Sequence, residues 1–222
     1  MNYLKHAIVQ FFNFIHGGVS QVITNPNYSY GIAIILVTVI IKLIIIPLNI
    51  KQIRSSLRMT KLQPEVKKIQ QKYKNNPQKL QQETMKLYKE NNASPMGGCL
   101  PMLIQWPILL ALYWVFNDLQ GISGVSFLWI KDLAKPDIIL AVLSGVTTYF
   151  SGAMMMSKSS DQSQSKQTNT MNIGMGAFMI FISWRLKSAL VLYWAVSNLI
   201  QIGMTVVAIK IEHNRDTGKV KA

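Results

Sequence analysis

One cation, Lys42, interrupts an almost continuous apolar run at residues 31–48. The run is long enough to cross a membrane, where a charge at the helix centre costs roughly 2.5–3.5 kcal/mol. Thr38 and Asn49 fall on the same helical face as Lys42. This face predicts non-covalent chemistry, in which water and polar side chains lower the cost of holding polar groups inside the bilayer. The simpler alternative is a lysine that snorkels to the nearby cytoplasmic boundary.

Polar stripes with helical spacing also mark other apolar segments. They consist of Ser144, Thr147, Thr148 and Ser151 in one segment, Trp194, Ser197, Asn198, Gln201 and Thr205 in another, and Gln105 in a third. Hydrogen bonding between helices explains each stripe on its own. Together with Lys42 the stripes predict a shared hydrated groove that opens toward the cytoplasm and is not a continuous pore.

No catalytic pattern accompanies these residues. The sequence contains no Walker loop, no HExxH motif, no paired carboxylates and no nucleophile beside a base. The single cysteine, Cys99, excludes an intrachain disulfide, and the three histidines lack metal-ligand spacing. We therefore expect neither an enzyme nor a bound cofactor or metal.

The helices that must position the groove follow from hydropathy. Half of the 222 residues are apolar and the formal net charge is +14, a combination typical of membrane proteins. We expect an all-α polytopic membrane protein with five transmembrane helices. The predicted spans are residues 28–50, 96–117, 137–156, 171–186 and 188–209. Two other classes of protein stay open. One is a small channel or transporter, although the sequence has no internal repeat of the kind that transporters usually show, and the other is a passive membrane scaffold.

Charge predicts the orientation of these spans. With the N-terminus outside, seventeen Lys and Arg residues face the cytoplasm and five face outward, so the positive-inside rule favours an outside N-terminus and a cytoplasmic C-terminus. Residues 118–136 are then an extracytoplasmic loop, 157–170 a cytoplasmic loop and 210–222 a basic cytoplasmic tail. Residues 1–27 have one apolar face and predict an amphipathic helix in the membrane interface; an uncleaved targeting segment is the alternative.

Residues 51–92 carry eleven of the cations and two apolar helical stripes separated by the turn signal Asn75-Asn76-Pro77. This pattern predicts a cytoplasmic hairpin of two antiparallel helices. Its basic face suits two compatible roles, which are anchoring to anionic lipid headgroups and recruitment of a partner or an incoming chain. The charge follows the topology and lacks a nucleic-acid binding motif.

Four motifs resemble the signatures of the YidC/Oxa/Alb insertase family, and the similarity extends from about residue 28 to residue 210. The motifs are SPMGGCLPMLIQWPI at residues 94–108, LQPE at 62–65, MKLYK at 85–89 and LVLYWAVSNL at 190–199. The chain resembles the short form found in Gram-positive-type bacteria and shows no lipoprotein-type signal peptide.

The resemblance implies a membrane protein insertase and chaperone of the bacterial plasma membrane that works with or without the Sec translocon. Its implied partners are nascent membrane proteins and, through a short tail, weakly the ribosome; it is expected to act as a monomer. Lys42 stands where the family usually has a groove arginine, Trp194 matches the groove tryptophan, and Ser151 lies near the polar third-span position. The groove residues are Thr38, Lys42, Gln105, Ser151, Trp194, Ser197, Asn198 and Gln201, and the hairpin residues are Gln63, Pro64, Glu65 and Tyr88.

Overall fold

The computed structural model describes residues 2–93, 100–155 and 162–220, and over these ranges the chain is helical, with one isolated β-bridge between Phe127 and Ile130. The all-α class predicted from the sequence is thereby confirmed for the described residues. Cys99 and part of the motif at 94–108 lie outside them. The elements are α1 (Asn2–Val22), α2 (Pro26–Lys61), α3 (Gln63–Lys72), α4 (Pro77–Glu90), α5 (Leu100–Asp118), the 3-10 helix η2 (Gln120–Ile122), α6 (Ile138–Met155), α7 (Gln162–Ser183) and α8 (Ser188–Val220).

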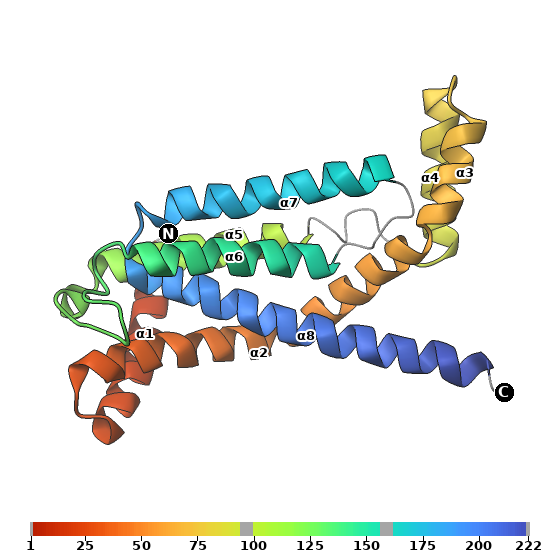
Figure 1. Cartoon of the computed structure of the whole chain (residues 1–222). Helices are drawn as coiled ribbons and strands as arrows, with labels where there is room; N and C mark the ends of the chain where they lie inside the picture. The colour runs from red at the N-terminus through yellow and green to blue at the C-terminus, as the bar shows by residue number, and fades with distance from the viewer. Residues whose placement is uncertain (1, 94–99, 156–161, 221–222) are drawn as a thin grey trace.

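Helices α2, α5, α6, α7 and α8 form a bundle, and α3 and α4 project from one end of it (Figure 1). Helix α6 packs against both α7 and α8, while α2 packs against α8 and α1. Among the described residues, α2 and the Ser188–Ile211 part of α8 are long and apolar enough to cross a membrane. Ile138–Met154 is a shorter apolar helix.

The ends of α2 are set by capping and by proline. The Asn25 side chain accepts a hydrogen bond from the Asn27 amide, and Pro26 occupies the first turn, where its missing N–H is not needed. The helix runs through residue 50 to Lys61, beyond the apolar segment predicted as a span. It ends there because Pro64 has no N–H to bond the carbonyl oxygen of Thr60, four residues earlier, and its ring clashes with that carbonyl. Hydropathy therefore marks the apolar part of this helix, not its end.

Helices α7 and α8 extend past their apolar parts in the same way. Helix α7 begins at Gln162, within the segment predicted as the loop 157–170, and α8 runs to Val220, within the predicted tail 210–222. These polar stretches contain no proline, so no missing N–H interrupts the helix in them. The predicted loop and tail are thus largely helical over their described residues.

Helices α6 and α7 approach each other through glycine. A Cβ atom placed at Gly145 would lie 2.6 Å from the carbonyl oxygen of Gly176 and would collide with the Ile180 side chain. A Cβ atom at Gly176 would lie 3.1 Å from the Gly145 carbonyl oxygen. Small residues of this kind let two membrane helices pack with their backbones in contact.

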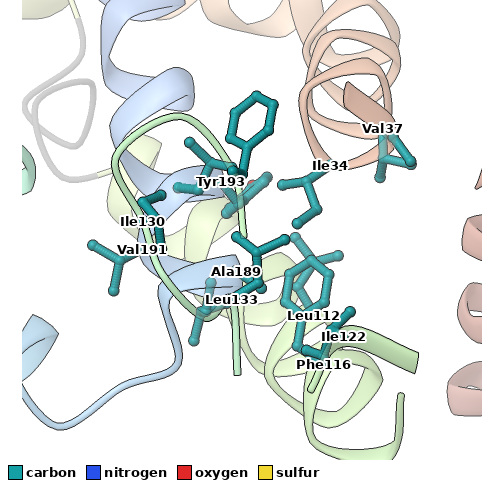
Figure 2. Packing of buried hydrophobic residues seen from close by; sticks show 14 of the residues in the cluster. Ile34, Val37, Leu112, Phe116, Ile122, Ile130, Leu133, Ala189, Val191 and Tyr193 are labelled. Carbon is teal, nitrogen blue, oxygen red and sulfur yellow. The ribbon is translucent and has the colours of Figure 1, made fainter. Parts of the chain in front are cut away.

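The main hydrophobic core lies at the end of the bundle where α5 ends and α8 begins (Figure 2). Ile34 from α2, Phe116 from α5 and Tyr193 from α8 meet there. The segment between α5 and α6 adds buried side chains, among them Ile130 and Leu133. The segment 118–136, predicted as an extracytoplasmic loop, therefore packs as a cap on the core.

Asp132 fixes the backbone of this cap. Its Oδ1 atom accepts hydrogen bonds from the amides of Gly124 at 3.1 Å and Ala134 at 2.9 Å. Its Oδ2 atom lies 3.4 Å from the Lys135 ammonium. Burial alone would raise the pKa of Asp132, but these hydrogen bonds and the cation outweigh burial and hold the pKa below its ordinary value.

The depressed pKa makes the stability of the cap depend on pH. Because the folded state binds the Asp132 proton less tightly than the unfolded state, the carboxylate stabilises the fold above its unfolded pKa of about 3.9, and this contribution is lost as pH falls through the lower folded value. We expect Asp132→Asn to lower the midpoint of thermal unfolding by a few degrees at pH 7, and we expect this difference to shrink progressively as pH falls below about 4, by circular dichroism in detergent. The exposed control Glu90→Gln should match the wild type at pH 7; an equal loss there would contradict the assignment to Asp132.

Candidate functional site

A cavity of about 390 Å³ lies among α2, α5, α6, α7 and α8. Most of its wall is apolar and comes from side chains such as Trp106, Phe178 and Ile182. Seven of the eight predicted groove residues line it, which are Lys42, Gln105, Ser151, Trp194, Ser197, Asn198 and Gln201. The structure thus brings together residues that lie up to 159 positions apart in the sequence.

Lys42 is the charged residue of this cavity. Its side chain is only 6% exposed, and it has no hydrogen bond or ion pair within the described part of the chain. Every described residue that lines the cavity is uncharged apart from Lys42. A buried, unpaired cation is costly, so the cavity gives strong electrostatic preference to water, carbonyl oxygens or carboxylates beside it.

Thr38 lies outside this arrangement. It is fully buried in α2 and is not among the residues that line the cavity. Its hydroxyl donates a hydrogen bond of 2.7 Å to the carbonyl oxygen of Ile34, one turn earlier. Threonine in a helix commonly satisfies its hydroxyl in this way, so sharing a helical face with Lys42 did not guarantee access to the groove.

Two amides continue the polar face of α2. Asn49 lines the cavity, and both Asn49 and Gln52 are buried with side-chain nitrogens that have no hydrogen-bond partner among the described residues. A buried donor without a partner costs about 1–3 kcal/mol, so these groups favour an incoming acceptor. The sequence analysis placed Asn49 on the Lys42 face but did not include Gln52. Gln52 follows Asn49 by three residues, and this helical spacing could have indicated that it lies on the same face.

Helices α6 and α8 are joined by a polar cluster centred on Thr148. Its Oγ1 atom accepts hydrogen bonds from Trp194 Nε1 at 2.9 Å and from Asn198 Nδ2 at 2.9 Å, and donates one to the Ser144 carbonyl oxygen at 2.7 Å. Ser144 Oγ also lies 2.9 Å from Ser183 Oγ of α7. Most of the α6 stripe therefore bonds helices together, and Ser151 is the member that lines the cavity.

Gln105 connects α5 to α8. Its Nε2 atom donates a hydrogen bond of 2.7 Å to the hydroxyl of Tyr193, which is fully buried. Tyr193 belongs to the motif at 190–199 but was not predicted as a groove residue. The contact holds the Gln105 amide at the wall of the cavity.

The predicted hairpin residues lie in α3 and α4, away from the cavity. Gln63, Pro64 and Glu65 form the first turn of α3, while Tyr88 is buried with Leu62, Val66 and Ala93 in a small core. The turn between the helices is closed by Asn76, whose side chain accepts a hydrogen bond from the Lys79 amide. Tyr88 thus has a packing role in this core.

Comparison with known proteins gives the family. The model of the family described as 60Kd inner membrane protein matches residues 21–215. The chain belongs to this family, that of the YidC insertases. A Clostridium tetani protein named membrane protein insertase YidC is 60% identical over 219 residues, covering 99% of both chains.

Two further relatives named membrane protein insertase YidC extend this comparison. The protein from Clostridium acetobutylicum is 51% identical, covering 98% of this chain and 90% of its own. The protein from Fusobacterium nucleatum is 42% identical, covering 91% of this chain and 95% of its own. The resemblance drawn from the four motifs is confirmed, and the name of the YidC family describes membrane insertion, not an enzymatic reaction.

Proposed function

We propose that this chain inserts integral membrane proteins into the bacterial plasma membrane and assists their folding, alone or together with the Sec translocon. The observation that carries the proposal is the cavity around Lys42, which a buried cation shares with polar residues from four other helices. Its family membership and the names of its relatives support the same role. No cofactor takes part in this mechanism.

In the proposed topology, α2, α5, α6, α7 and α8 each cross the membrane. The N-terminus lies outside, α1 lies in the outer interface, and α3, α4 and the end of α8 lie in the cytoplasm. The apolar lengths of α2 and α8 and the distribution of Lys and Arg support this arrangement. The basic α3–α4 unit contacts anionic lipid headgroups and incoming chains, and the end of α8 makes a weak ribosome contact.

The mechanism separates the apolar and polar parts of a substrate. The apolar segment of the substrate slides along the lipid-facing rim of α6 and α8, where Phe150 and Leu199 are exposed. The polar tail rests in the groove, where water, Lys42, Gln105 and Ser197 reduce its desolvation cost. Burial of the substrate helix in lipid and the membrane potential then move the tail outward. One protein copy provides all of these groups.

Site-specific photocrosslinking tests this function. A photoreactive residue at Trp194 or Gln105 should crosslink to the membrane segment of a ribosome-bound nascent chain, and the same residue at Phe14, exposed on α1, should not. A passive scaffold predicts no crosslinks from the cavity positions. A channel predicts solute flux through liposomes that contain the protein, which insertase activity does not require.

A further inference from the structure

A second cavity, of about 200 Å³, lies between the end of α5 and the turn that joins α7 to α8. It shares Leu186 and Leu190 with the wall of the groove, but its polar groups are different. The polar residues that line it are Tyr113, Asn117, Arg185 and Lys187. The described residues that line this cavity include two cations and no carboxylate.

The position of Lys187 is fixed by the end of a helix. Its Nζ atom donates hydrogen bonds to the carbonyl oxygens of Phe116 at 2.9 Å and Asn117 at 3.4 Å, in the last turn of α5. These carbonyls have no partner within their own helix, and the negative end of the helix dipole favours a cation there. A lysine held in this way loses little further side-chain freedom when an anion joins it.

Arg185 supplies the second positive charge. Its guanidinium lies 5.8 Å from the centre of the Phe181 ring, while the side chain stays exposed. It has no ion pair with an acid in the described part of the chain. A guanidinium offers a planar fork of donors that matches two oxygens of a phosphate group.

The surroundings of the cavity are apolar and exposed. Tyr113, which lines the cavity, is 43% exposed. Phe181 and Trp184, which lie shortly before Arg185 in the sequence, are 64% and 60% exposed. Tyr and Trp with this exposure are typical of the interface between headgroups and acyl chains. A free anion would leave these side chains uncovered, whereas a lipid covers them with its acyl chains.

We propose that this cavity binds the phosphate group of an anionic phospholipid, with Arg185 and Lys187 holding the phosphate and Tyr113 and Phe181 contacting the upper acyl chains. In the proposed topology the lipid belongs to the outer leaflet, but phosphate binding itself does not depend on insertase activity. The site therefore anchors the α7–α8 turn to the end of α5 through a bound lipid.

Native mass spectrometry of the full chain in a nonionic detergent, titrated with phosphatidylglycerol, tests this proposal. We expect one tightly bound lipid per protein and about a fivefold loss of affinity in Arg185→Gln, the usual effect of one cation near a lipid headgroup. Arg185→Lys keeps the charge but loses the bidentate fork, so its affinity should lie between those of the wild type and Arg185→Gln. Lys131→Gln removes an exposed cation that does not line the cavity and should leave the affinity unchanged.

Inorganic phosphate separates the two sources of the same chemistry. If millimolar phosphate does not displace the lipid, the site recognises the whole lipid. If phosphate displaces the lipid from the wild type but not from Arg185→Gln, the site recognises the phosphate group alone. Equal affinity for phosphatidylglycerol in the wild type and Arg185→Gln would overturn the proposal. An equal loss in Lys131→Gln would also overturn it, because the effect would then be general surface charge.

Discussion

Replacing Lys42 by alanine is expected to lower insertion of a substrate with acidic residues in its translocated tail by about tenfold or more. Hydrogen bonds to a charged group contribute roughly 1.5–3 kcal/mol, and the cavity offers the tail no other described cation. Lys42→Arg keeps the charge and should retain most of the insertion. Insertion is measured by protease protection of the tail in proteoliposomes that contain the purified protein.

Two controls isolate the role of the Lys42 charge. Lys51→Ala removes an exposed cation from the same helix and should leave insertion unchanged. A substrate with a neutral tail should be much less sensitive to Lys42→Ala. The thermal unfolding midpoint of Lys42→Ala should not fall, because the substitution removes an unpaired buried charge. Equal insertion of the acidic tail by wild type, Lys42→Ala and Lys42→Arg would exclude Lys42 from the mechanism.

Replacing Gly145 by alanine is expected to destabilise the packing of α6 against α7 by about 1–3 kcal/mol, the usual range for an overfilled contact. The added Cβ atom would lie 2.6 Å from a backbone oxygen of Gly176, so a helix must shift to admit it. The destabilisation should appear as a lower thermal unfolding midpoint in detergent.

Gly174→Ala is the matched control for this substitution. Gly174 lies in α7, like the Gly176 that Gly145 contacts, and nothing lies within 4 Å of a Cβ atom placed at Gly174. Since alanine favours a helix more than glycine does, Gly174→Ala should leave the midpoint unchanged or raise it. A Gly145→Ala protein as stable as the wild type would contradict the close packing of α6 and α7.

The residues predicted for the groove largely line one cavity, whereas the predicted ends of the helices differ from those in the structure. Hydropathy depends on burial in lipid or core, whereas the ends of α2, α7 and α8 depend on proline, capping and the absence of helix breakers. The bounds of α6 agree closely with the predicted segment 137–156, because Asp137 begins the helix by accepting a hydrogen bond from the Leu140 amide. Element type was thus easier to predict than element length.

The limits at the site have a similar physical cause. Helical spacing places polar residues on one face, but it does not show whether a hydroxyl bonds only its own helix, as in Thr38, or also accepts a hydrogen bond from a neighbouring helix, as in Thr148. The packing of the 118–136 loop on the core was not predicted, because its short turns lack a regular hydrophobic period. The Lys187 contact with α5 joins residues 71 positions apart and has no local signal.

The length of α8 has a mechanical consequence. As one continuous helix from Ser188 to Val220, it joins the groove residue Gln201 to the basic C-terminal end without a joint, over about 28 Å at a rise of 1.5 Å per residue. A flexible segment of the same number of residues would sample many distances and directions. A partner held at the end of α8 is therefore kept at a fixed distance from the groove, because a continuous helix and not a flexible linker connects them.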